Sequence, residues 1–529
     1  MGIFVHWLGR MRFLSAGILK ICRAINPRAT KPGDKKIINP LSGKMLQARL
    51  AINPHLIAYI CGLILAAPAL IMGLMAWSAI FLGDGTLLAF GFSALVVGLA
   101  SALLIRLGRR RAETSEIRGR DGLAVVALAW PMIALAGALP YLFSGHKLGF
   151  MNSFFESVSG FTTTGATILT RLDALPPSLL LWRALTHWLG GMGVIVLMLA
   201  VLPFLGIGGV HLLRSESFLG QVRLRPRIAQ TAKILWFIYF GLTVALVLLA
   251  RACGLSWFEA LCNGFSAIST GGFTTRDLSI GHYGRPGLEM LFTVFMFLGS
   301  LNFALYYQAS RGDWRGLFQD AEAKGYVLVI LLSALMIAVS LLAAGLYSNP
   351  LTALRQAVFQ VVSVASTTGF TSADWHKWPG FTQGLLFSLF FIGGCAGSTS
   401  GGIKCVRWLL IFKGLHRALR QHIRPRAVIG LSLGGRPVPE RLMSAVWSFW
   451  GLYIVVLAAS ALALTLMDLD LLSALTASAS ALGNVGLDLG QGFAPMPASA
   501  KAILILDMLL GRLEFFALLV LFKPEFWFR

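Results

Sequence analysis

Charged side chains are scarce in this chain of 529 residues. Only 13% of the residues are Asp, Glu, Lys or Arg, and 57% are hydrophobic, whereas a typical soluble domain is about a quarter charged. So few charges cannot cover a water-facing surface at this length. The mean hydropathy is +0.75, and many apolar blocks exceed the roughly 20 residues that a helix needs to cross a bilayer. The composition predicts an all-α membrane protein with several spans.

Acidic residues are half as numerous as basic ones, 22 against 45, which leaves a net charge of +23. Such a charge can indicate nucleic-acid binding. Here, however, the basic residues gather in the connections between apolar blocks, as the positive-inside rule describes for cytoplasmic loops. We therefore expect this chain to face membrane lipid and no nucleic acid.

Cysteine is also scarce, and the patterns of catalysis are missing. The six cysteines form no CxxC pair and no cluster with histidine, so we expect neither a disulfide framework nor a zinc site. No HExxH motif and no Rossmann fingerprint occurs. The glycine-rich stretch 397–404 is not a P-loop, because its lysine does not directly follow the second glycine. We expect no enzyme and no organic cofactor in this chain.

Ten apolar blocks are long enough to be transmembrane helices. Every second connection between them is basic, and the even number of spans places both termini in the cytoplasm. The blocks run at roughly 55–82, 85–107, 122–146, 178–205, 230–254, 287–309, 325–347, 381–412, 441–467 and 498–522.

Residues 1–50 precede the first block and differ from the rest, being basic and rich in proline. The stretch lacks the long apolar core and small-residue cleavage site of a signal peptide. We expect a basic cytoplasmic arm on the membrane surface. The sequence leaves open whether Met1 or Met45 is the start.

Four shorter apolar stretches lie in the connections on the opposite side, from the third span onward. They are too short to cross the membrane and too apolar for solvated loops, which is typical of re-entrant segments. They occupy 150–164, 256–271, 350–368 and 470–485.

The four short stretches end in the same pattern, a serine six residues before a glycine. The glycines recur every 97 to 117 residues, and such self-similarity indicates a repeated structural unit. The four copies read Ser159-Gly-Phe-Thr-Thr-Thr-Gly165, Ser266-Ala-Ile-Ser-Thr-Gly-Gly272, Ser363-Val-Ala-Ser-Thr-Thr-Gly369 and Ser480-Ala-Leu-Gly-Asn-Val-Gly486.

Non-helical backbone survives at membrane depth only when it is buried in protein or lines a water-filled cavity. Four extended strands around one axis present carbonyl oxygens that can replace the hydration shell of a cation, as in potassium channels. The alternative, glycine contacts for close helix packing, predicts motifs within spans rather than at the ends of half-spans. We predict a K+ selectivity filter at Thr163, Thr164, Gly165, Thr270, Gly271, Gly272, Thr367, Thr368, Gly369, Asn484, Val485 and Gly486.

Two later spans contain polar interruptions. The eighth is broken by residues 393–402, where five glycines in ten residues cannot form a stable helix. The alternative is a kink without function. The tenth carries Arg512 and Glu514, which cannot share a helix face, and we expect Arg512 to face the pore near the break. The alternative is a structural ion pair. The predicted gating residues are Gly394, Gly397, Ser398, Gly401, Gly402, Lys404 and Arg512.

The four loops, the glycine-rich break with Lys404 and the Gly511-Arg512-Leu-Glu514 segment resemble the Trk/Ktr/HKT superfamily of potassium transporters. Within it, the chain is most similar to the membrane subunits of bacterial Trk systems, over about residues 45–529. The resemblance implies K+ as the transported ion and a gating loop beneath the filter. It also implies a homodimer in the bacterial inner membrane and a cytoplasmic, nucleotide-binding regulatory subunit of TrkA type. Members with serine at the first filter glycine pass sodium, so Gly165 favours potassium.

The resemblance divides the chain into an arm, a two-helix unit and four pore repeats. The fourth loop departs from the family pattern because Asn484-Val485 replaces the threonines. The alternative function is a secondary transporter of another fold with a midplane ion site, which predicts two related halves rather than four units. The expected divisions are 1–50, 51–118, 119–228, 229–320, 321–436 and 437–529.

Overall fold

The computed structural model describes residues 52–112, 119–146, 148–200, 226–427 and 429–527. The expected basic arm at 1–50 and the basic connection within 201–225 lie outside these residues. The regular secondary structure of the described part is helical except for one short antiparallel pair, β1 (Ser432–Leu433) with β2 (Arg436–Pro437). The prediction of an all-α membrane protein is confirmed.

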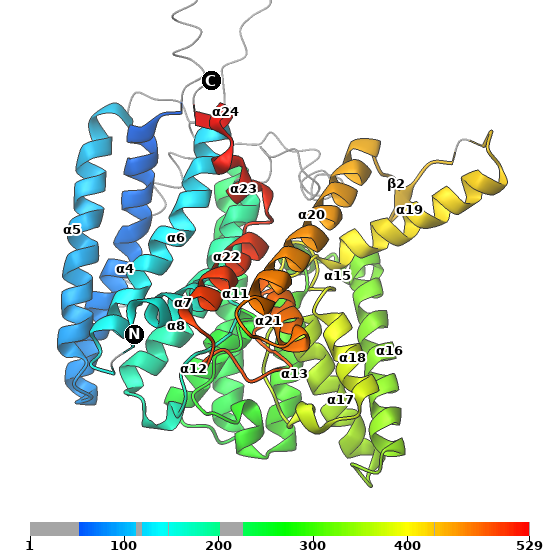
Figure 1. The fold of residues 1–529 in the computed structure, drawn as a ribbon, viewed down its shortest axis with the longest axis horizontal. Coiled ribbons are helices and arrows are strands. Elements are labelled where there is room, and N and C mark those ends of the chain that lie inside the picture. Colours follow the sequence, from blue (N-terminus) through cyan, green and yellow to red (C-terminus); the bar gives the residue numbers. More distant parts are fainter. Residues whose placement is uncertain (1–51, 113–118, 147, 201–225, 428, 528–529) are drawn as a thin grey trace, which may run out of the picture.

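Two long helices, α4 (Pro54–Leu82) and α5 (Leu87–Ala112), precede the repeats and lie side by side (Figure 1). Their approach is close enough that a β-carbon added to Gly108 would lie 2.4 Å from the carbonyl oxygen of His55. The Ser101 hydroxyl also donates a hydrogen bond of 2.8 Å to the carbonyl oxygen of Gly62. Small residues thus let the two backbones meet without a hydrophobic driving force, which lipid does not supply.

Each of the four following units places a short helix between two longer helical segments, and Figure 1 shows the short helices lying among the longer ones. The short helices are α7 (Phe150–Phe161), α12 (Trp257–Ile268), α17 (Pro350–Ala365) and α21 (Leu471–Gly483). The longer segments are α6 (Gly119–Phe143) and α8 (Pro177–Ala200); α11 (Pro226–Ala252) with α13 (Pro286–Ser300) and α14 (Phe303–Ser310); α16 (Ala321–Ala343) with α18 (Gly380–Leu389) and α19 (Cys405–Ile423); and α20 (Glu440–Thr465) with α22 (Ala498–Arg512).

Small helices fill the remaining connections. They are η2 (Leu172–Ala174), η3 (Ser279–Tyr283), α15 (Trp314–Gln319), η4 (Trp375–Lys377), α23 (Phe516–Leu519), η5 (Val520–Phe522) and α24 (Pro524–Trp527).

Three of the four short helices, α12, α17 and α21, begin at residues suited to a helix start. Ser256 forms a capping box with Glu259 at the start of α12, and the Asp470 side chain accepts a hydrogen bond from the backbone of Ser473 at the start of α21. Pro350 occupies the first position of α17, after the cap Asn349. The side chains of Ser256, Asp470 and Asn349 accept hydrogen bonds from backbone N–H groups that a helix terminus leaves without partners. Pro350 has no N–H that needs a partner.

In the described residues, six helices are long and apolar enough to cross a membrane, or seven when α13 and α14 count as one bent span. Polarity is arranged as lipid requires. Four leucines of α16 are 52–60% exposed, whereas the threonines of the first three loops are fully buried. The exposed leucines are Leu328, Leu331, Leu332 and Leu335.

The sequence predicts one broken span, whereas three are broken in the described residues. The eighth is interrupted between α18 and α19, as expected. The sixth also bends, by 92° between α13 and α14, and the tenth stops at Arg512, after which Glu514 and Phe515 take positive φ angles of 55° and 60°. Neither of these two breaks carries a run of glycines, so composition gave no sign of them.

Candidate functional site: a ring of four loops

The four loops that follow the short helices share one backbone conformation. In each, a residue with a φ of 51–58° is followed two positions later by a glycine with a φ of 79–89°. The first residue is Thr163, Thr270, Thr367 or Asn484, and the glycine is Gly165, Gly272, Gly369 or Gly486.

Each short helix ends in a Schellman motif, in which the backbone carbonyl of the repeated serine accepts a hydrogen bond. The N–H of Thr164 donates a 2.9 Å hydrogen bond to the carbonyl of Ser159, and the N–H of Thr163 donates a 3.0 Å bond to Gly160. The same pair of bonds recurs in the other three loops. The left-handed residue of this motif is usually glycine. Threonine there costs about 1–2 kcal/mol in each of the first three loops, so the surroundings hold the strained geometry in place.

The four glycines lie at the contacts between neighbouring loops. A β-carbon added to Gly165 would lie 2.1 Å from the carbonyl oxygen of Gly271, and one added to Gly272 would lie 2.0 Å from that of Thr368. The series continues from Gly369 to Val485 at 2.3 Å and from Gly486 back to Thr164 at 2.2 Å. The loops therefore close into a ring in the order of the sequence, and no side chain fits where the glycines stand.

Side chains also join the ring, at the contact between the fourth loop and the first. The Asn484 amide donates to the Thr164 hydroxyl at 2.9 Å and to the carbonyl of Met508, on α22, at 3.1 Å. Asn484 is thus both the left-handed residue of the fourth loop and its link to the first. This role accounts for its replacing a threonine.

The glycine-rich segment 393–404 packs against the ring. The Thr399 hydroxyl lies 3.3 Å from the hydroxyl of Thr270 in the second loop, and the N–H of Gly401 donates to the Thr367 hydroxyl of the third loop at 2.8 Å. A β-carbon on Gly401 would lie 2.6 Å from the carbonyl of Gly483, next to the fourth loop. The segment therefore contacts three of the four loops.

The two predicted gating cations both reach carbonyl oxygens of this segment. Arg512 is 5% exposed and donates to Thr399 at 2.9 Å and to Gly190 of α8 at 3.3 Å, while the Lys404 ammonium donates to the carbonyl of Ser400. Glu514 points elsewhere and forms an ion pair of 2.6 Å with Arg407. The expectation that Arg512 and Glu514 have different neighbours is confirmed.

A buried acidic residue, Glu322, binds one backbone N–H within the segment and one just after it. The carboxylate of Glu322, on α16, accepts hydrogen bonds from the N–H of Ala396 at 2.7 Å and of Val406 at 3.0 Å. Its side chain is 1% exposed. In sequence, Glu322 stands among other charges before a span and looks like a solvated helix start.

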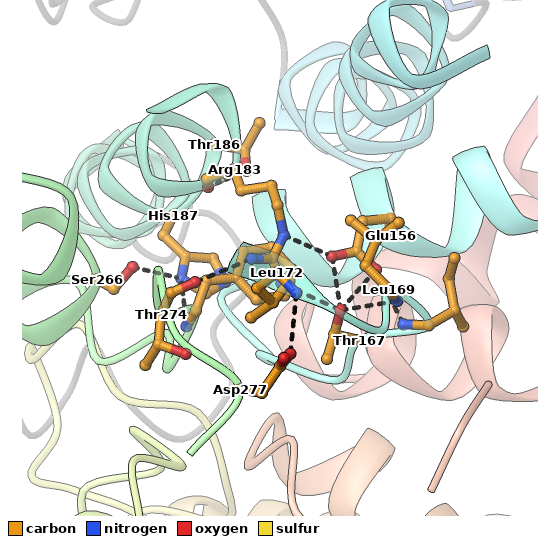
Figure 2. A network of polar contacts seen from close by, with 12 residues as sticks. Glu156, Thr167, Leu169, Leu172, Arg183, Thr186, His187, Ser266, Thr274 and Asp277 are labelled. Atoms are coloured by element: carbon orange, nitrogen blue, oxygen red, sulfur yellow. Dashed lines mark hydrogen bonds and ion pairs between the residues drawn. The ribbon is translucent and has the colours of Figure 1, made fainter. Parts of the chain in front are cut away.

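His187, on α8, is both packed and hydrogen-bonded. Its ring stacks on Phe273 at 4.0 Å between centroids. Its Nδ1 accepts from the N–H of Phe273 at 3.3 Å and lies 3.3 Å from the Ser266 hydroxyl (Figure 2). The histidine therefore packs against and hydrogen-bonds to residues on either side of the second loop.

Comparison with known proteins agrees with this architecture. The model of the TrkH family, described as cation transport proteins, matches residues 98–527. The chain is 42% identical over 438 residues to the Trk system potassium uptake protein TrkH of Salmonella typhimurium, covering 82% of this chain and 90% of that one. It is 39% identical to the TrkH of Halomonas elongata, covering 89% and 99%.

A solved structure shares the fold over most of the chain. The crystal structure of the potassium transporter TrkH from Vibrio parahaemolyticus superposes with a TM-score of 0.83 at 38% identity, covering 89% of this chain and 99% of that one. The chain belongs to the TrkH family of cation transport proteins.

Proposed function

We propose that this chain takes up K+ across the bacterial inner membrane, through a filter that the four loops form with their backbone carbonyl oxygens. Relatives that share up to 42% of its residues are named potassium uptake proteins of the Trk system. The ring of loops supplies the mechanism that such uptake needs. An ion that sheds its water in this ring exchanges hydration for fixed carbonyl dipoles.

One observation carries the proposal, namely that the ring closes. Each filter glycine packs against the carbonyl oxygen that precedes the glycine of the next loop, and the fourth loop packs against the first. Four backbones with the same turn are thereby held around one axis. The short helices direct their carbonyl ends toward the same place, and the negative end of a helix dipole favours a cation.

The glycine-rich segment would act as the gate beneath this filter. It contacts three loops, and Arg512 and Lys404 add two positive charges at its carbonyls. A positive charge near the path of a cation raises the barrier to its passage. The gate opens, on this proposal, when the segment and Arg512 part.

Control by nucleotide would come from a separate cytoplasmic subunit of TrkA type, since this chain has no Rossmann fingerprint. The name "Trk system" of the relatives fits an assembly of several components. We further propose a homodimer with one pore per protomer and with both termini in the cytoplasm. The basic residues of the connection between α19 and α20 fit that orientation, because Lys and Arg favour the cytoplasmic side.

Flux into vesicles tests the proposal. Purified protein is reconstituted into liposomes, and uptake of Rb+, as a stand-in for K+, is compared with uptake of Na+. We expect Rb+ uptake well above that of protein-free vesicles and above that of Na+. The same gene should restore growth of potassium-uptake-deficient bacteria on low potassium. Absence of Rb+ uptake by folded protein would refute the proposal.

The alternative of a secondary transporter with another fold has less support. Such a fold predicts two related halves, whereas this chain has four equivalent loops. A coupled transporter and an uncoupled pore differ in the same assay. Uptake by a pore is driven by the electrochemical gradient of the permeant ion itself, whereas coupled uptake also needs a gradient of a second ion.

A further inference from the structure

A buried ion pair lies behind the first two loops. Glu156, on α7, and Arg183, on α8, meet at 2.8 Å, and their side chains are 0% and 1% exposed. The Arg407–Glu514 pair, by comparison, has side chains that are 7% and 22% exposed. Charges are costly to bury unless every partner is satisfied, so a pair retained at this depth calls for an explanation.

The pair forms hydrogen bonds with the residues that follow the filter glycine in both loops. We call these residues the exit limbs; they are 166–169 in the first loop and 273–275 in the second. In the first exit limb, Glu156 accepts hydrogen bonds from the Thr167 hydroxyl at 2.9 Å and from the N–H of Ile168 at 3.0 Å. Arg183 also donates to the Thr167 hydroxyl, at 3.0 Å.

Arg183 also contacts the second exit limb. Its Nη1 donates to the carbonyl of Thr274 at 3.1 Å, and its guanidinium lies 4.1 Å from the centre of the Phe273 ring. Figure 2 shows the guanidinium lying between Glu156 and Thr274, with His187 on the side of Arg183 away from Glu156. One side chain therefore fixes two neighbouring limbs relative to each other.

The other two loops are held differently. In the third, the Ser372 hydroxyl donates to Gln356, which in turn contacts Glu289, and the Arg355 side chain in that group is 24% exposed. In the fourth, the carboxylate of Asp488 accepts from the N–H groups of Gly490 and Gly492 within its own loop. Only the first and second exit limbs, in the described residues, share a fully buried ion pair.

We infer that Glu156 and Arg183 are positioning residues for ion selectivity, because they fix the exit limbs of the first two loops against each other. This inference rests on the proposed function. Neither side chain needs to touch the ion. Gly165 and Gly271 meet at the boundary of the same two loops, so a displaced limb moves the carbonyl oxygens that would replace the water of K+. Discrimination between ions that differ mainly in size depends on the placement and number of such oxygens.

Glu156→Gln tests this inference. The substitution keeps the size of the side chain and one carbonyl oxygen, but it removes the charge that Arg183 pairs with. We expect the ratio of Rb+ to Na+ uptake per folded protein to fall at least fivefold. Thr167→Val, which removes the hydroxyl shared by both partners and retains the branched shape, should lower the ratio at least twofold.

The matched control is Glu259→Gln. Glu259 also stands on a short helix and pairs at 2.8 Å with an arginine, Arg276, but that arginine side chain is 37% exposed and the pair lies at the helix start. Its ratio should stay within twofold of the wild type. The amount and melting temperature of each purified variant separate a loss of folding from a loss of selectivity.

A wild-type ratio in folded Glu156→Gln protein overturns the inference. If that variant does not fold, a wild-type ratio in Thr167→Val overturns it instead. Wild-type protein and Gly165→Ser are measured alongside. Altered selectivity in Gly165→Ser together with a normal ratio in Glu156→Gln rejects the positioning role alone, whereas no Rb+ uptake by the wild type rejects the proposed function.

Discussion

At the scale of single residues, the ring depends on four glycines, because none of them has a side chain. Gly165, Gly272, Gly369 and Gly486 combine a positive φ with a neighbouring carbonyl 2.0–2.3 Å from where a β-carbon would stand. The first property alone would tolerate asparagine at a modest cost. The second tolerates no side chain, because the obstacle is backbone rather than the end of a flexible group.

The substitution Gly165→Ser is the sharpest test of these positions. Its β-carbon has to displace the carbonyl of Gly271, which changes the spacing of the first two loops. We expect discrimination between K+ and Na+ to fall about tenfold, equivalent to about 1.4 kcal/mol, with sodium gaining. The measurement is the ratio of Rb+ to Na+ uptake in liposomes.

Gly145→Ser is the control for backbone strain. Gly145 has a similar φ of 80°, but no atom lies within 4 Å of an added β-carbon there, and it sits in the connection between α6 and α7. Its ratio should match the wild type. Normal discrimination in folded Gly165→Ser protein would remove this glycine from the filter.

At the scale of elements, the break between α18 and α19 is the feature that sequence describes best, and the bend between α13 and α14 is the one it describes worst. Five glycines in ten residues disfavour a helix through local backbone entropy, before any tertiary contact is considered. The bend has no such composition. It follows from tertiary contacts, since the N–H of Phe303 donates to the carbonyl of Gly397 at 3.1 Å and that of Cys395 to Ser300 at 2.9 Å. The sixth span bends where the glycine-rich segment bonds to it.

Removing the guanidinium of Arg512 tests the gate. In Arg512→Ala the segment loses the 2.9 Å bond to Thr399 and the positive charge beside it, so we expect uptake of Rb+ to rise severalfold. The initial rate of uptake into liposomes, per folded protein, measures the change. A deletion within 396–401 should act in the same direction.

Lys501→Ala is the matched control, because Lys501 is a buried cation on the same helix. It contacts Asn152 and the carbonyl of Ala494, both at 2.9 Å, and does not bond to the segment. Its rate should remain near that of the wild type. Unchanged flux in Arg512→Ala and in the deletion, with normal amounts of protein, would place the gate elsewhere.

At the scale of the whole molecule, the arrangement in four units was predictable because the same sequence pattern recurs four times. Apolar blocks, short re-entrant stretches and a repeated serine–glycine spacing define it without any knowledge of contacts. The supports behind the ring were not predictable. Glu156 and Arg183 are 27 residues apart, and Glu322 and Val406 are 84 apart. Nothing local marks either pairing.

The division of work between subunits gives the prediction at this scale. Because the chain has no nucleotide-binding fingerprint, ATP or ADP should change the uptake of Rb+ by the reconstituted chain alone by less than twofold. Adding a purified regulatory subunit of TrkA type should make the rate depend on nucleotide. A clear nucleotide response without that subunit would show that the control site lies in this chain.

The sequence by itself determined which blocks are apolar and long enough to enter lipid, which apolar stretches are too short to cross it, and where glycine recurs so that the backbone can take a positive φ. Those properties depend on hydrophobicity and on backbone sterics, which are local. The tertiary structure decided that the four glycines close into one ring, that two further spans break, and that single buried carboxylates hold segments distant in sequence. Each of these depends on which backbone carbonyl or charged group lies opposite, and only folding brings such partners together.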